Sequence, residues 1–242
     1  WGGLLVVAMM WRTPSLRGVL FALSSTAVIL VGVAGWAWRN DNAIGYPAWA
    51  TTHGGYTLLL ANNDLLYDHL RQGNVRTTWD ATAFLEAYGH RYDSDPRAAE
   101  FWRRDWSNVD VRPTEVSESI DDQMVQEAAV ASIRRDPLMF AWSAVVRVCR
   151  LWSPFPHRVT GRSLVGIFVV SGYYLVLWIA VGLALLRHRS RLFTHRWWAI
   201  WLLVFTLSGV HAVYWSNLRM RAPVMPSLAV VAAFSLLPKE DQ

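Results

Sequence analysis

Four long uncharged stretches alternate with polar segments along the chain. They cover residues 18–38, 163–186, 197–218 and 222–238. A helix needs roughly 20 apolar residues to cross a hydrocarbon core about 30 Å thick. The first three stretches reach that length and the fourth comes close to it. The pattern therefore predicts an all-α membrane protein with about four full transmembrane helices.

A shorter apolar stretch, residues 1–11, opens the sequence. It is too short to cross a bilayer alone, and it lacks the basic leading region and small-residue cleavage site of a signal peptide. We interpret it as a truncated helix and expect the chain to be the C-terminal part of a longer protein. Residues 1–38 and 163–242 then form the transmembrane parts, with residues 39–162 inserted between them.

The inserted segment contains local signals of helix starts and ends. The pair Asn62 and Asn63 predicts the cap of a helix that runs to about Gln72, with Gly73 at its C-terminal end. Glycine favours that position because it adopts the left-handed backbone conformation without strain. We therefore expect a short helix of about two turns here.

Three further signals make the insertion mainly helical. Asp95–Pro96 and Asp136–Pro137 each combine a capping aspartate with proline at the first helical position. Between about Thr114 and Arg135, apolar residues recur at roughly helical spacing. The sequence thus predicts one helix before Asp136 and another that begins directly after it.

The stretch 138–152 is apolar but contains Arg147 and Arg150. Two charges in the middle of a bilayer would be costly. A helix that lies at the membrane interface, with both arginines directed toward phosphate headgroups, avoids that cost. We therefore predict an interfacial helix here and not a transmembrane one.

Arginines in the short connections predict the orientation. Arg12 and Arg17 flank the first connection, and four more arginines lie between residues 186 and 197. By the positive-inside rule both connections are cytoplasmic, which makes residues 39–162 extracytoplasmic. Arg219 and Arg221 then lie in a short outward loop, against the rule. This exception marks them as candidates for a function.

Charge and composition refine this picture. The chain has 23 basic and 18 acidic residues, and all acidic residues except Glu240 and Asp241 lie between Arg39 and Arg162. The basic excess therefore belongs to the membrane segments and their loops, which favours membrane lipids as partners and argues against nucleic acid. The 15 tryptophans suit aromatic belts at the headgroup level.

Several sequence runs, taken in order, resemble one family. They are Trp38-Arg39-Asn40, Thr52-His53-Gly54-Gly55-Tyr56, Asn62-Asn63, Ile133-Arg134-Arg135-Asp136-Pro137, Leu151-Trp152-Ser153-Pro154, and the run from His211 through Arg219-Met220-Arg221 to Pro223 and Pro226. Together they resemble the central and C-terminal parts of polytopic glycosyltransferases of the type C superfamily. This group includes the dolichyl-phosphate-mannose-protein mannosyltransferases and the lipid A aminoarabinose transferases.

The resemblance implies transfer of a sugar from a polyprenyl-phosphate carrier to a lipid or protein acceptor, at the outer face of a bacterial inner membrane. The family's acidic catalytic residues lie in the first outer loop, upstream of residue 1, so we expect the chain to be inactive alone. The resemblance leaves a divalent metal ion open. The histidines of the chain show no ligand spacing, so we assign no metal-binding residue and no other cofactor.

Arg219, Arg221 and Arg39 are the candidates for binding the donor phosphate, because a guanidinium group binds phosphate oxygens in pairs. The alternative for each of them is a headgroup contact at a helix end. His211 lies inside an apolar stretch and is a candidate for substrate binding. The alternative for His211 is a hydrogen bond to a neighbouring helix.

Gly54, Gly55 and Tyr56 would allow the backbone to approach a sugar, and Asn62 and Asn63 would bind its hydroxyl groups. A plain turn and helix capping are the alternatives. At the level of the whole chain, a non-enzymatic membrane module for binding or assembly stays open. A transporter is less favoured, because the apolar stretches show neither internal repeats nor glycine-proline breaks.

Overall fold

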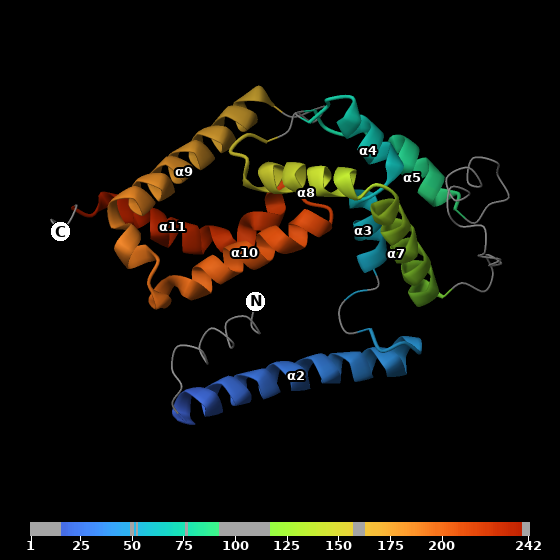
Figure 1. Ribbon diagram of the computed structural model, residues 1–242, viewed down its shortest axis with the longest axis horizontal. Coiled ribbons are helices and arrows are strands. Elements are labelled where there is room, and N and C mark those ends of the chain that lie inside the picture. The colour runs from blue at the N-terminus through green and yellow to red at the C-terminus, as the bar shows by residue number, and fades with distance from the viewer. Residues whose placement is uncertain are drawn as a thin grey trace.

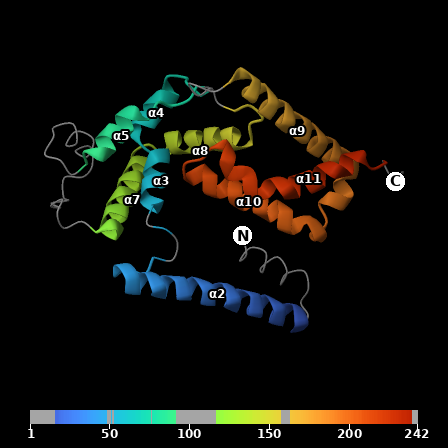
Figure 2. The same ribbon diagram turned by 180° about the vertical axis from the view of Figure 1, so that it is seen from behind.

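The computed structural model describes residues 16–48, 51, 53–75, 77–91, 117–156 and 163–238. Over these residues the chain is helical and contains no strand. Figures 1 and 2 show two groups of helices with α8 (Pro137–Trp152) between them, while α2 (Leu16–Ile44) lies apart from both groups. The prediction of an all-α fold is confirmed for the described chain.

The first group of helices comes from the inserted segment and the second from the C-terminal part. The first group consists of α3 (Gly54–Ala61), α4 (Asp64–Arg71), α5 (Thr82–Gly89) and α7 (Glu118–Arg135). The second group consists of α9 (Leu164–Leu192), η2 (His195–Trp197), α10 (Trp198–Val213), η3 (Leu218–Val224), α11 (Met225–Ala233) and η4 (Phe234–Leu236).

The predicted helix starts and ends in the insertion are confirmed wherever the structure describes them. The Asn63 side chain caps α4 by accepting a hydrogen bond of 2.9 Å from the Leu66 amide, and Gly73 has φ +81° just after the helix. Asp136 caps α8 by accepting a bond of 2.9 Å from the Met139 amide. The predicted start near Thr114 and the Asp95–Pro96 cap lie outside the described residues.

The close contact between α3 and α7 depends on a glycine. The Gly55 amide donates to Asp122 Oδ1 at 2.7 Å. A Cβ at Gly55 would lie 2.1 Å from the Asp122 carbonyl oxygen, a distance that no side chain tolerates. Gly54 and Gly55 therefore form the first turn of α3 against α7. Both residues are helical, so the plain turn given as the alternative is not formed, and the backbone at Gly55 approaches α7.

Each group of helices has its own apolar core. In the first, side chains such as Leu59, Leu66 and Phe84 are buried between α3, α4, α5 and α7. In the second, Val224 and Val231 pack with residues of α9, α10 and α11. Burying one such side chain stabilises a fold by about 1.5–3 kcal/mol. Because α8 contributes Val146 to the first core and Trp152 to the second, it joins the two groups.

Two stretches of the described chain are long and apolar enough to cross a membrane, judged by length and composition: Leu164–Leu192 and His195–Val213. The first exposes large apolar side chains such as Phe168 and Ile179. Exposed apolar surface of this kind is typical of lipid contact. These helices support membrane association. The predicted first span, residues 18–38, lies within α2, and its crossing of a membrane stays a prediction.

The predicted boundaries in the C-terminal part need correction. The helix predicted over 163–186 continues to Leu192, past a kink at His188 (φ −126°, ψ 29°). The helix predicted over 197–218 ends at Val213.

The stretch 222–238 is not one α-helix, since only Met225–Ala233 is α-helical and 3-10 turns flank it. Pro226 lacks the amide hydrogen that would bond to the Ala222 carbonyl in a regular α-helix over this stretch, and its ring would clash with that carbonyl. The count of four full transmembrane helices is therefore not confirmed.

Candidate functional site

A pocket of about 300 Å³ opens where α4, α8 and the segment after α10 meet. One face of α8 forms a wall of this pocket with Ser143, Val146, Arg147 and Arg150. Residues three, four and seven positions apart lie on the same side of a helix, which explains why these four residues share one wall. The pocket therefore has its base on the helix that joins the two groups.

Two indole rings from distant parts of the chain meet at the pocket. Trp79 follows α4 and Trp215 follows α10, and their ring centroids are 5.9 Å apart. The Trp215 amide donates to the Thr57 carbonyl at 3.2 Å, which fixes the segment after α10 against α3. The pocket thus combines residues of both helix groups.

All charged side chains that line the pocket within the described chain are positive. Arg147, Arg150 and Arg219 line it, and no Asp or Glu is among its described lining residues. The rest of the lining is neutral: Thr78, Ser143, Ser216 and Asn217 are polar, and Leu66, Leu70, Val146 and Leu218 are apolar beside the two indole rings. Such a site attracts an anionic ligand, because the fields of like charges add in a concave surface of low dielectric constant.

Arg147 is buried, with 4% of its surface exposed, and its charge is held by helix ends. Its Nε and Nη2 donate to the Ala212 carbonyl at 3.0 and 2.6 Å, and its Nη1 donates to the Ala61 carbonyl. These carbonyls lie in the last turns of α10 and α3, where they lack helical partners and where the helix dipole is negative. Burial lowers the pKa of Arg147 to about 10, so it stays charged at neutral pH.

The prediction that both α8 arginines point toward lipid headgroups was wrong for Arg147, which points inward. Arg150 is half-buried and donates to the Val75 carbonyl at 3.0 Å and to the Thr77 carbonyl at 3.1 Å. No hydrogen bond from its Nη1 occurs within the described chain. The sequence could not reveal the inward direction, because the accepting carbonyls belong to distant segments.

Asn62 supports Arg147 from behind the pocket wall. Its Oδ1 accepts bonds from Arg147 Nη2 at 3.3 Å and from the Tyr67 hydroxyl at 3.2 Å, while its Nδ2 donates to the Val213 carbonyl at 2.9 Å. Burial raises the pKa of Tyr67 to about 12, so this hydroxyl remains a donor. Asn62 and Asn63 are both buried and neither lines the pocket. In this structure they support the wall and cap α4.

Of the three arginines predicted to bind phosphate, Arg219 alone lines the pocket. It is exposed, and its guanidinium makes no hydrogen bond or ion pair within the described residues. Arg221 is buried on another side of η3, stacked on Tyr174. Arg39 lies on α2, over the Trp36 ring, and is not a pocket residue.

The remaining predicted substrate-binding residues also lie outside the pocket lining. His211 Nδ1 is 3.3 Å from the Trp215 carbonyl oxygen, so His211 contacts the chain just after its own helix. Tyr56 packs on Tyr88, with ring centroids 4.9 Å apart. Gly54 and Gly55 face α7. These residues shape the fold around the pocket.

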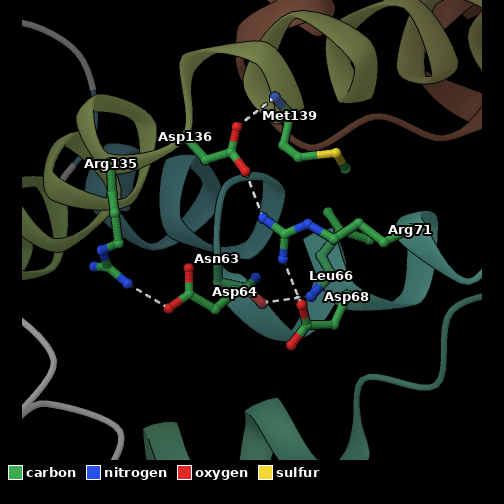
Figure 3. Close-up of polar contacts among 8 residues, drawn as sticks. All are labelled: Asn63, Asp64, Leu66, Asp68, Arg71, Arg135, Asp136 and Met139. Carbon is green, nitrogen blue, oxygen red and sulfur yellow. Dashed lines mark hydrogen bonds and ion pairs between the residues drawn. The ribbon is translucent and has the colours of Figure 1, made fainter.

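Ion pairs fix α4 relative to α8. Figure 3 shows Arg71 of α4 between Asp68 and Asp136, with nitrogen to oxygen distances of 2.5 Å to each carboxylate. Arg135 pairs with Asp64 in the same view. The capping bond from Met139 and the bond from Arg71 hold the pKa of Asp136 below its ordinary range. The two helices that line the pocket are thereby joined at their polar ends.

The sequence contained one overlooked signal for this site. Ser143, Arg147 and Arg150 lie on one face of an otherwise apolar helix. A polar face of this kind can pack against other polar groups of the protein as well as against lipid headgroups. Trp79 and Trp215 carried no local signal, since only the fold brings them together.

The described residues contain no group of three His, Cys, Asp or Glu side chains that could hold a metal ion. Comparison of the chain with protein-family models, curated proteins and solved structures gave no match. The functional argument therefore rests on the geometry and chemistry of the pocket.

Proposed function

We propose that the pocket binds the phosphate and sugar of a lipid-linked donor, and that the chain is the donor-binding part of an integral membrane glycosyltransferase. Its donor would be a sugar on polyprenyl phosphate, and its acceptor a lipid or protein at the outer membrane face. One observation carries the proposal: three arginines and two indole rings share a small pocket that no described carboxylate lines.

The arginines suit the phosphate. Arg219 and the Nη1 group of Arg150 have donors that no group of the described chain uses, and guanidinium groups bind phosphate oxygens at two points. Arg147, which is part of the pocket wall, adds positive charge although its own donors are occupied. A donor phosphate gains negative charge as its sugar leaves, so these groups would stabilise the transition state more than the ground state.

The rest of the lining suits a sugar. The Trp79 and Trp215 rings offer apolar faces for the C–H groups of a sugar ring. The Ser216 hydroxyl donates to the Arg147 carbonyl and can still accept a bond. The Asn217 oxygen is bonded to the Arg219 amide, while its side-chain nitrogen can still donate to a sugar hydroxyl. The volume of about 300 Å³ is at the small end of ligand pockets. It favours a compact headgroup over an oligosaccharide.

A non-enzymatic membrane module that binds the same ligand is the second candidate. The described lining offers no carboxylate to act as a general base. The proposal therefore assigns donor binding to this chain and leaves the base to another part of the enzyme. Sugar release from a labelled donor by the full-length protein would separate the two candidates.

Binding to isoprenyl phosphates tests the proposal. The whole chain in nanodiscs is titrated with a short-chain isoprenyl phosphate, free and sugar-linked. Arg219→Gln is expected to weaken both by about tenfold or more, since it removes a charge-assisted hydrogen bond. Trp215→Leu is expected to weaken the sugar-linked form alone. Arg39→Gln, an arginine outside the pocket, serves as control, and equal affinity of Arg219→Gln and wild type would refute the proposed site.

A further inference from the structure

Arg221 is fully buried but uses only part of its hydrogen-bonding capacity. Its Nη1 donates to the Leu151 and Ser153 carbonyls, at 2.9 and 2.7 Å, where α8 ends. Its Nε and Nη2 have no hydrogen-bond partner in the described chain. A buried donor without a partner is costly, so this pair of nitrogens requires an explanation.

The unpartnered nitrogens form the side edge of the guanidinium, whose parallel N–H groups bind two oxygens of one anion. The same chain shows this geometry elsewhere. Arg91 uses its Nε and Nη2 to bind both oxygens of Asp121, at 2.9 and 3.0 Å. The elements that Arg221 contacts, the end of α8 and one face of α9, supply no carboxylate, because the sequence contains no Asp or Glu from Pro137 to Pro238.

The surroundings of Arg221 are rich in donors. Its guanidinium carbon lies 3.8 Å from the Tyr174 ring centroid and 5.6 Å from that of Trp178. The Trp178 Nε1 and the Ser171 hydroxyl are also buried and have no hydrogen-bond partner among the described residues. Ser171, Tyr174 and Trp178 share one face of α9. The Tyr174 hydroxyl is the one polar side-chain group that interacts with the Arg221 guanidinium within the described chain, and it is not a carboxylate. The α8 dipole offsets only about half a unit charge.

We propose that the Nε and Nη2 edge of Arg221, together with the Trp178 indole N–H, binds a phosphate oxyanion at a second site. Arg221, Tyr174 and Trp178 do not line the pocket, so this site is separate from the donor site and does not depend on its function. A phosphate there would neutralise the buried charge. It would also fix η3, which carries Arg219, against α8 and α9.

Phosphate binding by the whole chain in detergent micelles tests this site. The measurements use an Arg219→Gln background, so that the pocket contributes little, and two probes, inorganic phosphate and dioctanoyl phosphatidic acid. Arg221→Lys keeps a cation that can reach the α8 carbonyls but lacks the paired edge. It is expected to raise the Kd about tenfold or more. Trp178→Phe keeps an aromatic ring without the N–H, and an increase of about threefold is expected.

Binding of phosphatidic acid alone identifies a lipid headgroup as the ligand, and binding of both probes identifies phosphate itself. Failure of both probes to bind would overturn the proposal, as would wild-type affinity in both variants. If Arg221→Lys does not fold, Trp178→Phe decides the question alone. All phosphate measurements use the Arg219→Gln protein, so they do not depend on whether the pocket binds the donor. A failure of the donor-site proposal would be seen instead in the titrations with isoprenyl phosphates.

Discussion

At the level of single residues, Arg147 shows how this chain buries a charge without a carboxylate. Its donors bind carbonyls at the ends of α3 and α10, and Asn62 accepts a further bond. Removing the guanidinium would leave these buried acceptors unpaired, at about 1–3 kcal/mol each. Arg147 therefore joins the end of α3, in the first helix group, to the end of α10, in the second.

We expect Arg147→Leu to lower the free energy of unfolding by about 3–5 kcal/mol, because several buried acceptors lose their donor at once. Denaturant unfolding in detergent micelles measures the change. Arg134→Leu, which alters an exposed arginine of α7, is the control and is expected to change the free energy by less than about 0.5 kcal/mol. Similar stability of the two variants would contradict the role of Arg147.

Gly55 gives a second prediction at this scale. Gly55→Ala would place a methyl group 2.1 Å from the Asp122 carbonyl oxygen, so α3 and α7 must separate. We expect a loss of about 1–3 kcal/mol in the free energy of unfolding, as in other overpacked contacts. Gly54→Ala is the matched control, since its Cβ would meet its nearest neighbour at 3.9 Å. If both substitutions changed the free energy of unfolding equally, the helix propensity of alanine would explain the result, and the contact between Gly55 and Asp122 would not.

At the level of elements, the start of α8 is set by Asp136, which caps the helix and pairs with Arg71. The pKa of Asp136 is lowered in the folded protein, so its contribution is fully present above the pKa of about 4 in the unfolded chain. The contribution is lost as the pH falls through the lower, folded-state value. Asp136 therefore stops stabilising the start of α8 only when the solution is acid enough to protonate it in the folded protein.

We expect Asp136→Ala to lower the melting temperature at pH 6 and 7, and the difference from wild type to shrink below about pH 4. Thermal unfolding of both proteins across pH 3–7 measures this trend. Asp68→Ala, which removes the other partner of Arg71 but no cap, is expected to have a smaller effect at neutral pH. A difference that grows as the pH falls would contradict the assigned role.

The sequence predicted those elements whose signals are local. Three of these signals act within one helical turn: the caps at Asn63 and Asp136 and the glycine after α4. The helix ends that they predict therefore did not depend on the rest of the fold. The ends of α9 and α10 and the 3-10 turns of η3 depend on packing and on two prolines, and there the predicted boundaries were wrong.

The candidate site was less accessible to prediction than the fold. Arg219 was predicted from its unusual place in an outward loop, and it lines the pocket. Arg221, two positions later, was predicted for the same reason, but the 3-10 winding of η3 directs it to α9. Trp79 and Trp215 meet where Trp215 is bonded to α3 and packs against the first core, a contact between segments that no spacing rule connects.

At the level of the whole molecule, the pocket lies where the inserted helices meet the C-terminal helices. Residues of α4 and α8 form its walls, and the segment between α10 and η3 closes it. If residues 39–162 are extracytoplasmic, the pocket lies near the outer membrane face, where a lipid-linked headgroup is found. The orientation of the chain is therefore directly tied to the proposed function.

Cysteine accessibility tests this orientation. In a Cys149→Ser background, Glu86→Cys on α5 and Ser190→Cys near the end of α9 each add one exposed thiol. We expect a membrane-impermeant maleimide to label the Glu86→Cys protein in intact cells, and the Ser190→Cys protein only after the membrane is opened. Labelling of the second variant in intact cells would reverse the predicted orientation.

Photocrosslinking tests the central claim, donor binding in the pocket, most directly. An isoprenyl phosphate sugar with a diazirine on the sugar is bound to the whole chain in nanodiscs, irradiated, and mapped by peptide mass spectrometry. The account predicts labels near Trp79 and within residues 215–219, which an excess of unlabelled donor removes and Arg219→Gln strongly reduces. Labels confined to the lipid-facing surfaces of α9 and α10, unchanged by competitor or by Arg219→Gln, would contradict it.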